Sequence, residues 1–123
     1  MKNKKLPPKD SFSGFFLKKE IIKAIKELGF DSPTPIQQRV IPFLNSSSQD
    51  LIASAQTGTG KTAAFGLPIL NQINTDSPNV QNLILCPTRE LCVQITSDLR
   101  NYSKYLNRVD ILAVYGDARI EKQ

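Results

Sequence analysis

Apolar residues recur at helical spacing in the first third of the chain. Between residues 17 and 28 they fall three or four positions apart and lysines cover the opposite face, which predicts an amphipathic helix that ends at Gly29. A second helix is predicted to begin at Thr34, with Pro35 as its first residue. Pro42 is expected to kink this helix or to end it early. The expected buried residues of the second helix are Ile36, Val40, Phe43 and Leu44.

From residue 51 onward, short apolar runs alternate with helical stretches. Helices are expected to begin near Lys61 and near Arg89, and the runs between them are predicted strands: LIAS at 51–54, NLILC at 82–86 and VDILAVY at 109–115. Because the runs are apolar on both faces and are joined by helices, they predict an α/β fold in which helices flank a parallel sheet on both sides. Functional groups gather at the carboxyl ends of the strands in such a sheet.

Length and charge indicate a single small domain or part of a larger one. Of the 123 residues, 40% are hydrophobic, which is enough for a packed core. The net charge of +5 is concentrated in residues 1–9, which we expect to form a basic flexible tail, while residues 10–123 are nearly neutral. Such a tail is more often simply solvated, and attraction to a phosphate backbone is the alternative.

The cysteine pattern and the absence of a long apolar run indicate where in the cell the protein is expected. Cys86 and Cys92 are the only cysteines and the chain has no histidine, so neither a zinc site nor a disulfide framework is indicated. No apolar run approaches the roughly 20 residues of a membrane span. The N-terminal lysines are followed by prolines instead of the apolar core of a signal peptide. We therefore expect a cytoplasmic protein without membrane contact.

The turn after the first predicted strand has the composition of a phosphate-binding loop. The pattern G-x-x-x-x-G-K-[ST] is met by AQTGTGKT at 55–62, with Ala55 in the place of the first glycine. Small residues let backbone N–H groups converge on phosphate oxygens at the positive end of the following helix. Lys61 can reach the outer phosphates and the Thr62 hydroxyl can bind Mg²⁺. The alternative is a glycine-rich turn that binds nothing, which leaves the lysine and the hydroxyl at this place unexplained.

The segment GFDSPTPIQ at 29–37 offers a side chain that can recognise adenine. The carboxamide of Gln37 can donate one hydrogen bond and accept another, which matches the N6 donor and N7 acceptor of adenine and mismatches guanine. Phe12, seventeen residues before Gly29, could stack on the base. The alternative for Phe12 is a hydrophobic staple in front of the first helix.

Together these segments resemble the DEAD-box RNA helicase family. GFDSPTPIQ with Phe12 upstream is similar to the Q motif of that family, AQTGTGKT to its motif I, and PTREL at 87–91 to its motif Ia. The resemblance runs from about Phe12 to the end of the chain and includes the alanine in the first glycine position. It implies a RecA-like P-loop NTPase fold, of which residues 10–123 would be the N-terminal part of an incomplete domain.

The resemblance also implies roles for single residues. ATP would be bound by Phe12, Phe30, Pro35, Gln37, Ala55, Gln56, Thr57, Gly58, Thr59, Gly60, Lys61 and Thr62. Within this set, Lys61 and Thr62 would be catalytic, and Thr62 would hold the Mg²⁺ that accompanies ATP. The RNA backbone would be contacted by Pro87, Thr88, Arg89 and Gly116. A second RecA-like domain, further along the same protein, would be the partner of this one.

The residues of motif Ia support this assignment in part. Thr88 can cap the next helix, and Arg89 falls in its first turn at the carboxyl edge of the predicted sheet, where a phosphate would be attracted. Taken alone, Arg89 would be a surface charge beside Glu90.

Two features depart from the family pattern. Gly116 is followed by Asp117 where the family usually has a second glycine, and no D-E-A-D segment occurs before Gln123. We therefore expect this chain to be the adenine-nucleotide-binding portion of an ATP-dependent RNA helicase, without turnover by itself. The alternatives are a stand-alone nucleotide- or RNA-binding adaptor and another P-loop ATPase or DNA helicase.

Overall fold

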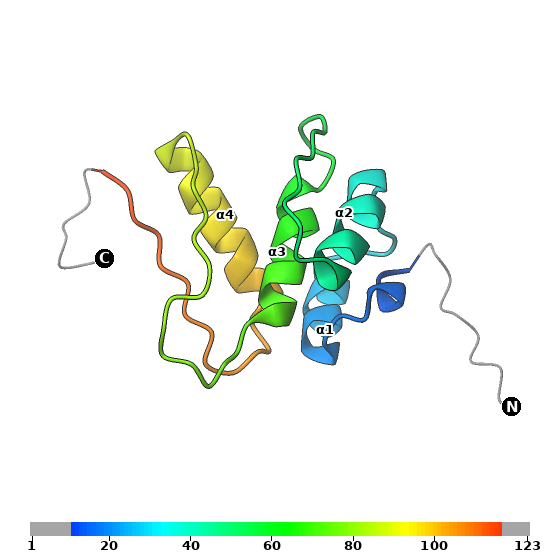
Figure 1. Cartoon of the computed structure of the whole chain (residues 1–123), viewed down its shortest axis with the longest axis horizontal. Coiled ribbons are helices and arrows are strands. Elements are labelled where there is room, and N and C mark those ends of the chain that lie inside the picture. Colours follow the sequence, from blue (N-terminus) through cyan, green and yellow to red (C-terminus); the bar gives the residue numbers. More distant parts are fainter. Residues whose placement is uncertain (1–10, 117–123) are drawn as a thin grey trace, which may run out of the picture.

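The structure is a computed structural model that describes residues 11–116 (Figure 1). Its described part contains one short 3₁₀-helix and four α-helices, namely η1 (Phe12–Phe15), α1 (Lys19–Glu27), α2 (Pro35–Ser46), α3 (Lys61–Gln72) and α4 (Arg89–Tyr102). The basic tail predicted for residues 1–9 and the departure at Asp117 lie outside the described residues.

The predicted end of α1 and the predicted starts of α3 and α4 are confirmed. The first helix ends at Glu27, and Gly29 follows with φ of +85°. The third begins at Lys61, directly after the glycine-rich turn. The fourth begins at Arg89, and the Thr88 hydroxyl accepts a hydrogen bond from the Leu91 N–H at 3.2 Å, as expected of a cap.

The predictions for α2 need two corrections. The helix continues for four residues past Pro42, to Ser46, so the proline does not end it early. Its buried residues are Gln37, Val40 and Ile41, whereas Phe43 and Leu44 are only half-buried. The buried stripe is thus rotated toward Gln37, because α2 packs along α3 and its first turn faces the glycine-rich turn.

The core lies between the helices. In Figure 1, α3 lies between α2 and α4, and it contacts both of them, while α1 packs against α4 and η1 against α2. The buried core draws on every helix and consists of Phe12, Phe15, Ile21, Ile25, Ile41, Ala63, Leu67, Leu70, Ile95, Leu99 and Tyr102. No helix in residues 11–116 is long and apolar enough to cross a membrane.

The predicted parallel sheet is not confirmed. The segments 51–54, 82–86 and 109–115 run as extended chain, and no strand is formed within the described residues. Burial alternates along the second segment, where Ile84 and Cys86 pack against the core while Leu83 and Leu85 are exposed. A strand makes its hydrogen bonds to neighbouring strands, so side-chain packing against the core alone does not make these segments strands.

Candidate functional site

The glycine-rich turn leads directly into α3. Gly58 and Gly60 have φ of +76° and +81°, a conformation that favours glycine, and the Thr59 hydroxyl donates to the Gln56 carbonyl at 2.5 Å. Gly60 occupies the cap position of α3, and no side chain caps this helix. The first amide groups of a helix lack carbonyl partners within it, so the start of α3 is open to an anion.

Two side chains of the α2 start hold this turn. The Thr34 hydroxyl donates to the Thr59 carbonyl at 2.7 Å, and Nε2 of Gln37 donates to the Gly60 carbonyl at 3.1 Å. Oε1 of Gln37 accepts from the Thr34 N–H at 2.9 Å, which fixes the amide from its other side. The segment predicted to recognise adenine and the turn predicted to hold phosphate therefore form one connected unit.

The shape and the donor groups of this turn determine whether a nucleotide phosphate fits it. A Cβ at residue 60 would lie closer to Nε2 of Gln37 than van der Waals contact allows, whereas nothing within 4 Å would meet a Cβ at residue 58. Lys61 is exposed and Thr62 half-buried at the start of α3. The open amides, the lysine and the hydroxyl together form a donor set suited to phosphate oxygens.

Gln37 is almost completely enclosed, with 2% of its surface exposed. A carboxamide has two N–H donors and two acceptor lone pairs, and the hydrogen bonds to Gly60 and Thr34 use one of each. One donor and one acceptor remain, which is the pair that adenine requires. Recognition of adenine by Gln37 stays a prediction.

The aromatic residues predicted near the base lie in a cluster. Phe12 is 4% exposed, and its ring centroid lies 5.9 Å from that of Phe15 and 6.0 Å from that of Phe30. Phe30 continues the cluster to Tyr102 of α4, at 5.9 Å. Phe12 is therefore part of the core, and both its stacking on a base and its role as a staple for the first helix stay predictions.

The residues predicted to contact RNA lie near one another. Pro87, Thr88, Arg89 and Gly116 are all exposed. Cζ of Arg89 lies 4.9 Å from the centroid of the Tyr115 ring, which places the start of α4 beside the end of the extended segment 109–115. Their contact with RNA stays a prediction.

Sequence reasoning missed two residues of this arrangement. Thr34 was expected only to begin a helix, yet its hydroxyl also holds the glycine-rich turn. The pattern Thr-x-x-Gln at 34–37 fits a capping box and could have indicated the bond between Thr34 and Gln37. Tyr115, which contacts Arg89, carries no signal in the sequence.

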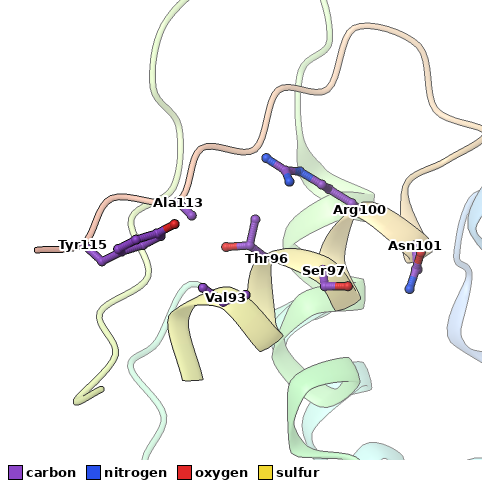
Figure 2. Close-up of a pocket in the computed structure, with 7 residues that line it drawn as sticks. All are labelled: Val93, Thr96, Ser97, Arg100, Asn101, Ala113 and Tyr115. Atoms are coloured by element: carbon purple, nitrogen blue, oxygen red, sulfur yellow. The ribbon is translucent and has the colours of Figure 1, made fainter. Parts of the chain in front are cut away.

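A pocket of about 320 Å³ lies elsewhere, between α4 and the extended segment 109–115 (Figure 2). It is lined by Val93, Thr96, Ser97, Arg100, Asn101, Ala113 and Tyr115. Two of its polar side chains have protein partners, since Thr96 donates to the Cys92 carbonyl at 2.8 Å and Arg100 to the Ile111 carbonyl at 2.9 Å. No residue of the phosphate-binding turn lines it, and we assign the site to the turn because the donor set lies there.

Comparison with known proteins decides the family. Residues 34–123 match the DEAD/DEAH box helicase family. The chain belongs to this family. The ATP-dependent RNA helicase CshA of Listeria monocytogenes is 50% identical over 112 residues, which cover 91% of this chain and 21% of that protein. The chain thus spans about a fifth of the length of this relative.

Solved structures of DEAD-box proteins are similar to this chain in fold. The crystal structure of a DEAD box protein from the hyperthermophile Methanococcus jannaschii matches with a TM-score of 0.84 and 36% identity, covering 92% of this chain and 31% of that one. S. cerevisiae Dbp5 bound to RNA and ADP BeF3 matches with a TM-score of 0.78 and 31% identity, covering 90% of this chain and 30% of the other. The prediction of the DEAD-box family from three short motifs is confirmed.

Proposed function

We propose that this chain is the nucleotide-binding portion of an ATP-dependent RNA helicase, an enzyme that hydrolyses ATP to open RNA duplexes locally. The observation that carries the proposal is the pair of hydrogen bonds by which Thr34 and Gln37 hold Thr59 and Gly60. They join a group able to recognise adenine to a turn able to hold phosphates. The related CshA protein is named an ATP-dependent RNA helicase.

The proposal includes a complete RecA-like domain with a parallel sheet. The extended segments carry exposed apolar residues, among them Ile52, Leu83, Leu85, Leu112 and Val114. A soluble domain rarely exposes such a face, so these side chains are expected to be covered by further strands and helices of the same domain. The need to cover these apolar side chains disfavours the alternative that the chain is a stand-alone adaptor. A second RecA-like domain would then complete the ATP site.

In the proposed site, the turn and the start of α3 hold the nucleotide. The amides of the turn and of the α3 start would donate to phosphate oxygens, Lys61 would neutralise their charge, and the Thr62 hydroxyl would hold Mg²⁺. When bound, Mg²⁺ would supply further neutralisation of the phosphate charge. Gln37 selects adenine through its remaining donor and acceptor, and the cluster of Phe12 and Phe30 supports the base side of the site.

Contact with RNA is proposed for the other end of the described structure. Pro87, Thr88 and Arg89 present a guanidinium and a helix start to the RNA backbone, and Gly116 lies next to Tyr115 at the same edge. Dbp5 was solved with RNA and a nucleotide together, which supports two such sites on one fold. We also propose that the protein acts in the cytoplasm.

Nucleotide selectivity tests the adenine part of the proposal. In the full-length protein, Gln37→Ala should weaken ATP binding relative to GTP binding by about 1 to 3 kcal/mol, as measured by titration with both nucleotides. Gln38→Ala is the matched control, because Gln38 lies beside Gln37 on α2 but donates to the Pro33 carbonyl at 3.3 Å instead of to the turn. Equal losses for ATP and GTP in Gln37→Ala would show that this residue does not recognise the base.

RNA-stimulated ATP hydrolysis tests the activity itself. The full-length protein should hydrolyse ATP faster with single-stranded RNA than with single-stranded DNA, and Lys61→Ala should abolish the turnover. Equal stimulation by DNA would favour another P-loop ATPase or a DNA helicase. The 123-residue chain alone should bind nucleotide without turnover.

A further inference from the structure

Phe16, between η1 and α1, combines a strained backbone with an exposed aromatic ring. Its φ of +56° and ψ of +35° lie in the left-handed region, which is unfavourable for a bulky side chain. The residue is 82% exposed, so burial of the ring within this chain does not offset the strain. Backbone strain of this kind persists at functional sites, so the position indicates a binding role for the ring.

Two asparagine side chains hold this turn in its conformation. Nδ2 of Asn45, on α2, donates to the Phe15 carbonyl at 2.9 Å. Nδ2 of Asn71, on α3, donates to the Phe16 carbonyl at 3.4 Å, and its Oδ1 accepts from the Lys18 N–H at 2.8 Å. The backbone on both sides of the exposed ring is therefore fixed to α2 and α3.

Positive charge continues from this turn along α1. Residues 18–27 contain four lysines and two glutamates, and all four lysines are exposed. Lys19, Lys23 and Lys26 are spaced by four and three residues, which places them on one face of the helix. They span about 10 Å along its axis. A phosphate backbone is complementary to such a row of charges.

Tyr105 adds a second aromatic ring beside α1. Nζ of Lys23 lies 4.3 Å from the centroid of this ring, and Nζ of Lys104 lies 5.0 Å from it. Lys104 and the Tyr105 hydroxyl both contact the Glu27 carboxylate, which neutralises that negative charge. Aromatic rings and positive charges thus lie at both ends of α1. This basic aromatic surface consists of Phe16, Lys19, Lys23, Lys26, Lys104 and Tyr105.

The surroundings of Phe16 favour a nucleic acid over a protein as the ligand. Among the exposed large apolar side chains of residues 11–116, only Leu28 shares the η1–α1 region with Phe16, and it lies beyond the other end of α1. The core of a protein interface is apolar and poor in lysine. Single-stranded nucleic acids instead bind where bases stack on aromatic rings beside positive charges. An isolated exposed ring followed by lysines has this second composition.

We propose that the basic aromatic surface binds single-stranded RNA, with one base stacked on Phe16 and with Lys19 and Lys23 at the neighbouring phosphates. In Figure 1, the start of α4 lies at the upper left and the blue η1 at the right, with α3 between them. This contact is therefore separate from the one proposed for Arg89. It rests on the function proposed above, because it gives the same RNA a second contact.

Replacing Phe16 in the full-length protein tests the stacking. Glycine adopts a positive φ without strain, so Phe16→Gly should unfold at no lower temperature than the parent and should bind ATP equally well. It should bind fluorescent oligouridine of about 40 nucleotides about tenfold more weakly, as expected for the loss of one stacked base. Phe16→Trp keeps an aromatic ring and should retain the affinity. Phe16→Leu keeps an apolar side chain without a ring and should lose as much as glycine.

Replacing a lysine tests the phosphate contacts. Lys19→Gln should weaken the binding of all RNA sequences alike and should lower the slope of log affinity against log salt concentration by about 1. Arg39→Gln is the matched control, because Arg39 is an exposed cation of α2 outside this surface, and it should change neither quantity.

The outcomes separate this inference from the proposed function. Unchanged RNA affinity in Phe16→Gly, or full affinity in Phe16→Leu, would overturn the stacking and would leave an acidic protein as the ligand to test on this surface. An unchanged salt slope in Lys19→Gln would overturn the phosphate contact. A parent protein that binds no single-stranded RNA would contradict the proposed function itself.

Discussion

The helices and the extended segments of this protein differ sharply in how completely they are packed. Leu67 of α3 is fully buried, at 0% exposure, while Leu83 of the extended segment 82–86 is 80% exposed. Ile25 of α1 and Ile52 of the segment 51–54 show the same contrast, at 0% and 100%. The same residue types thus form a closed core in one region and an open apolar face in the other.

The difference follows from where each element makes its hydrogen bonds. A helix satisfies its N–H and C=O groups internally, so α1 to α4 form once their apolar faces meet. A strand needs hydrogen bonds to a neighbouring strand on at least one side, and the extended segments within residues 11–116 form no such ladder. The helices of the described chain therefore have their backbone hydrogen bonds within themselves, whereas the extended segments do not.

The glycine-rich turn at 55–60 lies at the boundary between the two regions. It follows the exposed segment 51–54 and leads into α3, and the hydrogen bonds from Thr34 and Gln37 come from the helical side. The side of the turn that faces α2 is therefore fixed by packed elements. Such a fixed turn fits the nucleotide site that we propose for it.

The largest expected effect comes from truncating the same residue type in both regions. Leu67→Ala removes a fully buried side chain and should lower the free energy of unfolding by about 2 to 5 kcal/mol. Leu83→Ala should change it by less than about 0.5 kcal/mol in the 123-residue chain. Urea unfolding measures both. A loss for Leu83→Ala in the full-length protein as large as that for Leu67→Ala would show that the open face is covered there.

The two glycines of the turn give the next largest contrast. Both have positive φ, so alanine at either position costs about 1 kcal/mol of backbone strain. At residue 60 the added Cβ also displaces the Gln37 amide, so we expect a total of about 2 to 3 kcal/mol for Gly60→Ala and only the strain for Gly58→Ala. Thermal unfolding of both variants measures the difference. Equal losses would contradict the contact between Gln37 and Gly60.

The cap of α4 should have a smaller effect. Thr88→Ala removes the hydroxyl that accepts from the Leu91 N–H, and we expect the protein to lose about 1 kcal/mol of unfolding free energy. Thr88→Ser keeps the hydroxyl and should lose much less. Urea unfolding of the pair measures the cap. If serine and alanine destabilise the protein equally, the hydroxyl does not stabilise the start of α4.

The smallest effect is expected at a surface contact between α1 and the turn after α4. The Glu27 carboxylate accepts hydrogen bonds from the Lys104 ammonium and from the Tyr105 hydroxyl, each at 2.5 Å. These hydrogen bonds, together with the positive charge of Lys104, lower the pKa of Glu27. A lowered pKa in the folded state stabilises the protein above the ordinary value of 4.5, and this contribution is lost as the pH falls below it.

A pH series of unfolding experiments measures this contribution. The parent protein should be slightly more stable than Glu27→Gln at neutral pH, and the difference should disappear as the pH falls below 4.5. Added salt should also reduce it, because the groups are exposed to solvent. A difference that stays constant from neutral to acidic pH would exclude the charged form of Glu27 as its source.

The sequence by itself determined the helices and the family. The starts of α3 and α4 and the end of α1 depend on residues within a few positions of each boundary, such as Gly60, Thr88 and Gly29, so local patterns were sufficient. The three motifs are likewise short and contiguous, and the family match over residues 34–123 confirmed what they indicated.

The tertiary structure alone decided which distant groups meet. The hydrogen bond from Gln37 to the Gly60 carbonyl joins residues twenty-three positions apart. Gln37 is buried in the first turn of α2, whereas the hydrophobic pattern predicted Ile36 as the buried residue there. The contact of Arg89 with Tyr115 likewise arises from packing. The three apolar runs read as strands in the sequence, but strand formation requires partners, and a local pattern carries no information on whether those partners are present.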